Sequence, residues 1–211
     1  MNKWAEHLEP LIKQYEKKKH PLNYANRYQL LVMVILSAQD SDKHINELSV
    51  SFFKTFPSLT ELKTALSEDL FPLISSVRNF SNKSKWLVKL AQVIGDDSKI
   101  PTTMDELTKL PGIGRKSANV IIRESGGKAE GIIVDLHVLR VAPRLGVAIG
   151  DKPEKIEKQL MEIMPHEKWN EIGMALSFLG RETCRPSNPN CVQCILNSVC
   201  NYYNTVLKAG K

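Results

Sequence analysis

Four cysteines lie close together near the C-terminal end of the chain, and no other cysteine occurs. Their spacing is Cys184-x6-Cys191-x2-Cys194-x5-Cys200. In a reducing cytoplasm such a group indicates a metal site before it indicates disulfides. Zinc sites usually contain two close pairs with a longer loop between them, and four thiolates also hold a [4Fe–4S] cluster. From the spacing alone, zinc and iron–sulfur both remain open, and either would hold together a segment too short to fold by burial.

A glycine-containing turn is the second pattern that could do chemistry. Pro111 ends a short helix, and Gly112 and Gly114 permit backbone conformations that are closed to other residues. We expect Ile113 between them to be buried and a helix to restart at Ser117. Backbone N–H groups exposed at such a helix start bind an anion, and a DNA phosphate is the obvious candidate. A contact of this kind positions a strand without reading its bases.

Lys116 and Asp135 are the candidate catalytic side chains. Attack on a sugar carbon requires an unprotonated amine, so the pKa of Lys116 must fall. The positive end of the helix and neighbouring Arg115 would lower it, and partial burial would lower it further. Asp135 follows the apolar residues 131–134 and is expected to be an N-cap. A capping carboxylate can also act as a base or stabilise positive charge.

Composition places these residues in a water-soluble globular protein. The chain has 211 residues, of which 42% are hydrophobic and 25% charged, and this excludes general disorder. The longest apolar run, residues 30–36, is far shorter than the ~20 residues of a membrane span. The N-terminus has no hydrophobic signal core, which predicts a cytoplasmic protein. The net charge of +6 is compatible with nucleic-acid binding.

The elements that must position these residues are expected to be helices. Apolar faces at helical spacing occur over residues 48–56, 86–94 and 156–163, the last behind Pro153, and no convincing strand pattern is present. Residues 30–36 are apolar all round and predict a buried helix. Thr102 and Asp105 resemble a capping pair for the helix before Pro111. We expect an all-α protein of roughly nine or ten helices.

Two segments together resemble a known family. Residues 110–119, Leu-Pro-Gly-Ile-Gly-Arg-Lys-Ser-Ala-Asn, and residues 134–141, Val-Asp-Leu-His-Val-Leu-Arg-Val, are similar to the endonuclease III family of helix-hairpin-helix/Gly-Pro-Asp DNA glycosylases. Residues 36–39 with Asp42 resemble an early helix end in that family. The resemblance covers roughly residues 22–203. It implies a two-lobed helical fold, with a bundle over residues 20–130 and a second lobe of residues 1–19 plus 131–211.

The resemblance also implies a reaction and its partners. Lys116 would attack C1′ of a damaged nucleotide, form a Schiff base and cleave the strand by β-elimination, with Asp135 assisting. The substrate would be double-stranded DNA carrying a damaged base, by family default an oxidised pyrimidine, or an abasic site. The base would be rotated out of the stack into a pocket between the lobes. The protein is expected to be a monomer that acts in the cytoplasm, on the nucleoid if the source is bacterial.

The resemblance selects a [4Fe–4S] cluster for the four cysteines and gives Gln39 the role of filling the gap left by the extruded base. We further expect DNA contacts from Asn79 and Arg185 and from the hairpin residues Gly112, Ile113, Gly114 and Arg115.

The chain departs from the family pattern in three places. Where the family usually has Gln-x-Thr-Asp, residues 39–42 of this chain are Gln-Asp-Ser-Asp, so that Asp40 is an additional acidic residue. The usual Gly-Leu-Tyr-Asn-Ser-Lys loop is Arg-Asn-Phe-Ser-Asn-Lys at residues 78–83, so the wedge is Asn79 or has moved to Phe80. Leu136 replaces the usual Thr after the catalytic Asp. Two other functions are compatible with these residues. The first is a mismatch glycosylase that removes uracil or thymine, and assays on a panel of duplexes with different modified bases would distinguish it. The second is a non-catalytic iron–sulfur DNA-binding protein, which would not need Lys116.

Overall fold

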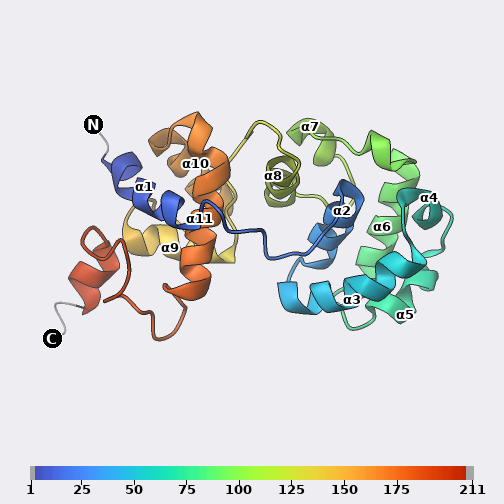
Figure 1. Cartoon of the computed structure of the whole chain (residues 1–211), viewed down its shortest axis with the longest axis horizontal. Coiled ribbons are helices and arrows are strands. Elements are labelled where there is room, and N and C mark those ends of the chain that lie inside the picture. The colour runs from blue at the N-terminus through green and yellow to red at the C-terminus, as the bar shows by residue number, and fades with distance from the viewer. Residues whose placement is uncertain (1–2, 208–211) are drawn as a thin grey trace. The chain divides into compact units, whose positions relative to one another are not determined.

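The computed structural model describes residues 3–207, and every regular element in that range is a helix (Figure 1). The expected all-α class is confirmed. The described range holds eleven α-helices instead of nine or ten, because three of them, α4, α5 and α7, are single turns of four residues. No helix within it combines the length and the apolar character needed to cross a membrane.

The chain separates into two compact units. One is Lys19–Lys128, and the other combines the residues before Lys19 with those after Lys128. Lys19–Lys128 contains α2 (Arg27–Leu36), α3 (Asp42–Thr55), α4 (Leu59–Leu62), α5 (Phe71–Ile74), α6 (Phe80–Ile94), α7 (Met104–Leu107) and α8 (Arg115–Glu124), with 3-10 turns at Ser67–Leu70 and Asp97–Lys99.

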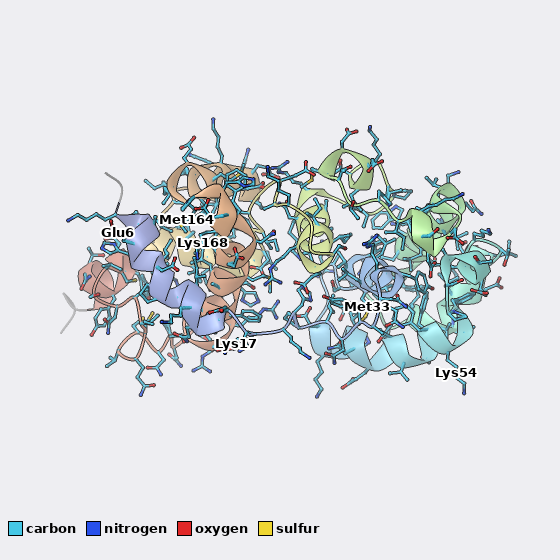
Figure 2. All side chains as sticks on the ribbon, turned by 45° about the horizontal axis from the view of Figure 1, so that its top comes forward. Glu6, Lys17, Met33, Lys54, Met164 and Lys168 are labelled. Atoms are coloured by element: carbon cyan, nitrogen blue, oxygen red, sulfur yellow. The ribbon has the colours of Figure 1, made fainter. Side chains whose placement is uncertain are left out.

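Helix α2 is the core of the unit Lys19–Lys128. All of its residues from Leu30 to Leu36 are buried, and it packs against α3, α6 and α8 (Figure 1). Figure 2 shows Met33 among the packed helices, whereas Lys54 lies at the outer end of α3. The uninterrupted apolar run therefore forms a buried helix, as the sequence predicts, since a helix covered on every side leaves no face for polar residues.

Side-chain caps begin several helices of this unit. Asn26 accepts a hydrogen bond from the backbone N–H of Gln29 at the start of α2, and Ser41 does the same for His44 at the start of α3. For α7 the expected capping pair is wrong by one residue. Thr103, not Thr102, is the N-cap and accepts from the backbone N–H of Glu106. The shift of one residue is within the usual uncertainty of a helix boundary.

The second unit is organised around α11. It contains α1 (Trp4–Tyr15), α9 (Leu136–Leu145), α10 (Pro153–Ile163) and α11 (Trp169–Glu182), with a 3-10 turn at His166–Lys168 and a π-helical segment at Tyr203–Leu207. α11 packs against α9 and α1 (Figure 1). A Cβ atom at Gly180 would lie 2.7 Å from Cβ of His137, so glycine permits the close approach of α11 and α9.

Candidate active site

The turn before α8 depends on Gly112. Its φ is +79°, and a Cβ atom there would lie 3.0 Å from Cε3 of Trp86 on α6. Both the backbone conformation and the contact therefore favour glycine. Ile113 is buried, as expected, and its N–H donates to the carbonyl of Leu110 at 3.2 Å. The turn is thus anchored on its inner side by Ile113 and packed against α6.

Gly114 differs from what the sequence predicts. Its φ of −91° and ψ of 174° are extended backbone that any residue can adopt, and a Cβ atom there would have no neighbour within 4 Å. It is the N-cap of α8 and provides no side-chain hydrogen bond to the helix. The glycine therefore leaves open space in front of the helix N-terminus, where an anion is stabilised by the helix dipole.

Lys116 is in the first turn of α8, and its side chain is exposed instead of partly buried. Its positive charge acts on His20 in the same unit. The pKa of His20 is lowered to about 4, mainly by burial and also by the positive charges of Lys116 and Arg123, while Glu124 and Asp42 oppose the shift. The backbone N–H of Leu22 donates to Nδ1 of His20 at 3.1 Å, as a neutral ring permits. In the sequence His20 only ends a run of lysines, so its burial and its interaction with Lys116 are products of the fold.

Asp135 is the N-cap of α9, as the sequence predicts. Its Oδ1 accepts hydrogen bonds from the backbone N–H groups of His137 at 2.8 Å and Val138 at 2.9 Å. Oδ2 accepts from the hydroxyl of Ser177 on α11 at 2.6 Å, and the guanidinium of Arg181 is 3.9 Å away. Ser177 is 1% exposed. No local pattern singles out a serine inside α11, so its contact with Asp135 is a product of helix packing.

Gln39 and Asn79 are both exposed, and both adopt positive φ, 61° and 59° respectively. Asn79 is the N-cap of α6. Phe80, the other wedge candidate, is half-buried and packs edge-to-face on Phe71 with 5.1 Å between ring centroids. The structure therefore favours Asn79 over Phe80 as the residue that can project from this turn.

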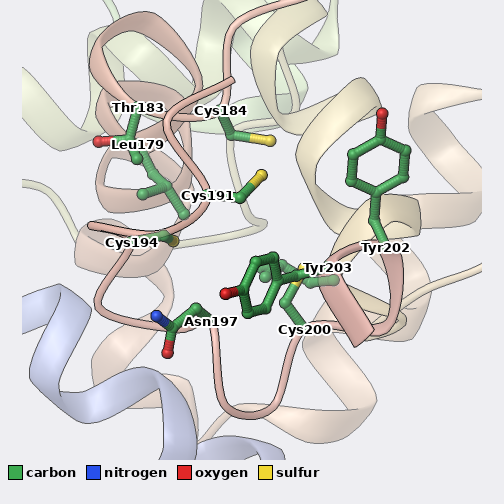
Figure 3. Close-up of a pocket in the computed structure, with 10 residues that line it drawn as sticks. Leu179, Thr183, Cys184, Cys191, Cys194, Asn197, Cys200, Tyr202 and Tyr203 are labelled. Carbon is green, nitrogen blue, oxygen red and sulfur yellow. The ribbon is translucent and has the colours of Figure 1, made fainter. Parts of the chain in front are cut away.

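The four cysteines follow α11 and line one pocket (Figure 3). Leu179, Asn197 and Tyr203 also line it. All four thiols are free of disulfides, with Cys191 and Cys200 buried and Cys184 and Cys194 half-buried. Burial raises the pKa of the Cys191 and Cys194 thiols, and the charges of the other cysteines raise it further. Four thiolates in this pocket would repel one another unless a cationic centre neutralised them.

Arg144 of α9 connects the cysteine loop to the helices. Its guanidinium lies 3.6 Å from Sγ of Cys184, donates to the carbonyls of Arg185 at 2.8 Å and Pro186 at 3.1 Å, and lies 4.8 Å from the ring centre of Tyr202. The side chain of Arg185 itself is exposed. A cation beside a thiolate ligand stabilises its charge.

Among the described residues, no three His, Cys, Asp or Glu side chains converge as the ligands of a single metal ion do. The expected [4Fe–4S] cluster requires a different arrangement of ligands, because each of its four thiolates binds a separate iron atom. The sulfur atoms then surround a cluster instead of meeting at one ion. Four free cysteines line one pocket, with Arg144 beside Cys184, and thiolate sulfur is the donor that a [4Fe–4S] cluster requires.

The expected site residues divide between the two units. Gln39, Asn79, Lys116 and the residues of the hairpin turn belong to Lys19–Lys128, whereas Asp135, Arg185 and the cysteines belong to the other unit. Within Lys19–Lys128 the structure joins the Gln39 and Asn79 turns by direct hydrogen bonds. Within the second unit it connects Asp135 to the helix that leads into the cysteine loop.

Comparison with known proteins gives a consistent result. Residues 32–166 match the family model of the HhH-GPD superfamily base excision DNA repair proteins. The endonuclease III of Rickettsia felis is 39% identical over 191 residues, which cover 89% of this chain and 88% of that protein. Two solved structures each have a TM-score of 0.89. They are a non-covalent endonuclease III–DNA complex, 31% identical and covering 99% of both chains, and a trapped covalent endonuclease III–DNA intermediate, 32% identical and covering 99% of this chain and 98% of the other.

Proposed function

Since the chain belongs to the endonuclease III family of HhH-GPD base excision DNA repair proteins, we propose that it is a DNA glycosylase and AP lyase whose nucleophile is Lys116. The observation that carries this proposal is the exposed position of Lys116 in the first turn of α8, directly behind the open space at Gly114. A solved relative was trapped as a covalent intermediate with DNA, which supports a covalent step in this chain.

The proposed reaction begins when the unprotonated Nζ of Lys116 attacks C1′ of the damaged nucleotide and displaces the base. The amine and the opened sugar then form a Schiff base. Loss of a proton from C2′ breaks the bond between C3′ and its oxygen, so that the strand is cut 3′ to the lesion. The carboxylate of Asp135, held by Ser177 and by the start of α9, stabilises the positive charge that develops on the sugar.

DNA binding is assigned to the hairpin and to two exposed turns. Gly114 and Arg115 would bind a phosphate at the start of α8, supported by the helix dipole and by the absence of a capping side chain at Gly114. Gln39 would fill the space left by the extruded base, and Asn79 would enter the stack from its turn. Both are exposed and adopt positive φ, which supports this assignment. Exposed Arg185 would add a phosphate contact.

The four cysteines are proposed to hold a [4Fe–4S] cluster. When bound, the cluster cross-links the loop that follows α11 and contributes structural stability. The residues of this chain then hold the loop in place, since Arg144 bonds two of its carbonyls. We further propose that the protein acts as a monomer in the cytoplasm, on double-stranded DNA with a damaged pyrimidine or an abasic site.

Borohydride trapping on a duplex with an abasic site tests the nucleophile. The wild-type protein should become covalently attached to DNA during turnover, and Lys116→Gln should abolish the attachment with little loss of binding, because a nucleophile lowers the barrier more than it strengthens docking. Lys109→Gln is the matched control, since Lys109 is an exposed lysine of the same hairpin and pairs only with Asp105 at 2.6 Å. Trapping of Lys116→Gln at the wild-type level would exclude this nucleophile.

A panel of duplexes, each with one modified base, would identify the lesion. Preferential removal of oxidised pyrimidines is the expected result, and removal of uracil or thymine from mismatches without strand cleavage would favour the mismatch-glycosylase alternative.

A further inference from the structure

In the unit Lys19–Lys128, the non-glycine residues with positive φ lie in two turns. These residues are Gln39 and Asn79, and both are exposed. A left-handed backbone conformation is unfavourable for such residues and persists only where the surrounding structure holds it. The contacts that hold the two turns therefore decide how these side chains are presented.

The first contact comes from the helix behind Asn79. Lys83 of α6 is 2% exposed, and its Nζ donates to the carbonyls of Leu36 and Ala38, each at 2.7 Å. Burial lowers the pKa of Lys83, while the charge of Asp40 opposes that shift. The carbonyl of the last residue of α2 and the carbonyl of Ala38, directly before Gln39, are thus bonded to the helix that Asn79 caps.

The second contact is made by a side chain of the Gln39 turn, which bonds the backbone of the Asn79 turn. Oδ2 of Asp40 accepts a hydrogen bond from the backbone N–H of Arg78 at 3.2 Å, directly before Asn79. Oδ1 of Asp40 accepts from Nδ1 of His44 at 2.7 Å, and Nε2 of His44 lies 2.9 Å from the hydroxyl of Ser76. The Asp40 side chain is only 13% exposed. The additional acid noted in the sequence therefore points into the protein, where it joins the two turns.

Asp40 is ionised in this arrangement. Burial acts to raise its pKa, but the hydrogen bonds from His44 and from the backbone N–H groups of Ser41 and Arg78 outweigh burial and lower it. The charge of His44 also lowers the pKa of Asp40, and the charge of Asp40 in turn acts on Lys83.

We propose that Asp40 and His44 are positioning residues that hold the Gln39 and Asn79 turns together. As a result, the side chains of Gln39 and Asn79 enter the DNA stack as one preformed pair. The proposal rests on the proposed function and deepens it. A pair that is already ordered loses little conformational entropy on binding, which favours opening of the stack. The clasp is defined as Asp40, His44 and Ser76, and in this proposal it acts by holding the turns that carry Gln39 and Asn79.

The test separates stack opening from chemistry. Fluorescence of 2-aminopurine, placed opposite a tetrahydrofuran abasic-site analogue in a duplex, reports the opening, and the analogue cannot react with Lys116. Borohydride trapping on a single-stranded abasic oligonucleotide reports the chemistry without any opening. Asp40→Ala and His44→Ala are the test variants. Glu47→Ala is the matched control, because Glu47 pairs with Lys43 at the same i,i+4 spacing on α3 but lies in an exposed pair, 3.9 Å apart.

We expect both test variants to lose at least half of the fluorescence change at saturating protein and to remove a paired damaged base about tenfold more slowly, a loss typical of imperfect positioning. Their trapping on the single strand should stay within about twofold of wild type, and Glu47→Ala should match wild type in all three assays. A wild-type fluorescence change in both variants would overturn the clasp. A parallel loss of single-strand trapping would also overturn it, because the residues would then maintain the fold around Lys116. Absence of trapping by the wild-type protein would sink the proposed function instead, while the fluorescence comparison would still decide the clasp.

Discussion

Ser177 donates a hydrogen bond of 2.6 Å from its hydroxyl to Oδ2 of Asp135, while Oδ1 of the same carboxylate caps α9. The two oxygens of Asp135 therefore have different partners. One is bound to a helix start, and the other is held by a buried side chain of α11. This division allows the capping role of the carboxylate to be separated from its proposed catalytic role by substitution.

Asp135→Asn should retain the cap and slow base removal. Asparagine caps helices as well as aspartate, so the cap itself should be retained. The amide nitrogen that replaces Oδ2 cannot accept the hydrogen bond from Ser177, so the free energy of unfolding should fall by about 1 kcal/mol. Loss of the negative charge should slow single-turnover excision by roughly 10²- to 10³-fold, the effect of removing one stabilising group. Chemical denaturation and excision kinetics measure the two quantities. Excision at the wild-type rate would show that Asp135 is only a cap.

Two further variants complete that comparison. Asp135→Ala removes the cap as well as the charge, so it should cost about 1 kcal/mol of stability more than Asp135→Asn does, in addition to the loss of excision. Ser177→Ala removes the hydrogen bond to Oδ2 of Asp135 and also the one that Nε of Arg181 donates to the Ser177 hydroxyl at 3.4 Å, but it keeps the carboxylate and its charge. It should reduce excision less than Asp135→Asn does and destabilise the fold by about 1 kcal/mol.

Gly112 and Gly114 should respond differently to the same substitution. Gly112→Ala combines a positive φ with a Cβ atom 3.0 Å from Trp86, so it should destabilise the protein by about 1–3 kcal/mol. Gly114→Ala meets neither obstacle and should leave the melting temperature nearly unchanged. Thermal unfolding of the pair checks this. Equal destabilisation by both substitutions would contradict the structure of the turn.

Gly114→Leu should weaken DNA binding while the protein stays folded. A large side chain would occupy the open space before α8, where the phosphate is proposed to bind, and the loss should be similar for all sequences because phosphate contacts do not read bases. Wild-type affinity should fall with salt with a log–log slope of about −0.9 per phosphate contact, and the variant slope should be shallower. Binding titrations at several salt concentrations measure both. A loss confined to one DNA sequence would argue against the phosphate assignment.

Acid should destabilise the protein partly through His20. In the folded protein burial lowers the pKa of His20 to about 4, below its ordinary value of 6.5. Between these values the unfolded chain binds a proton that the folded chain does not, so this contribution to stability is present above pH 6.5 and is lost as the pH falls to 4. The loss amounts to at most roughly 3 kcal/mol.

An NMR titration of the His20 ring measures this pKa directly. Lys116→Gln should raise it toward the ordinary value, because the positive charge of Lys116 contributes to the shift. His20→Asn should flatten the loss of stability between pH 6.5 and 4 in chemical denaturation. Titration of His20 at its ordinary value, unaffected by Lys116→Gln, would show that the ring is neither buried nor near Lys116.

If the four cysteines hold a [4Fe–4S] cluster, the protein should be coloured. Purified protein should show broad visible absorption and contain about four irons per chain, as a [4Fe–4S] cluster on four thiolates requires. Removing the cluster should expose the loop after α11 to proteolysis, since that loop has little burial of its own. Metal analysis and limited digestion are the measurements. One zinc per chain without iron would reject the cluster.

Much of this protein follows from local patterns. The buried helix at Leu30–Leu36, the start of α10 at Pro153 and the cap at Asp135 were all predictable, because helix periodicity and capping depend on residues within one or two turns. Local reasoning was less accurate for the hairpin. Gly112 and Gly114 look alike in sequence, but only Gly112 has a positive φ.

Contacts between distant residues were decided by tertiary structure. Asp40 bonds the backbone 38 residues away at Arg78, and Asp135 bonds Ser177 across 42 residues. In the sequence, Lys83 looks like an ordinary surface lysine. In the fold, α6 packs against α2, and Nζ of Lys83 donates to the carbonyl of Leu36. Neither periodicity nor spacing encodes such pairs, because they depend on which helix faces meet and on how much water the meeting excludes. The sequence alone determined the all-helical class and pointed to the four cysteines and to the candidate nucleophile, because these depend on residue type and local spacing. Packing decided which polar groups are buried together, and these groups hold the candidate site in shape.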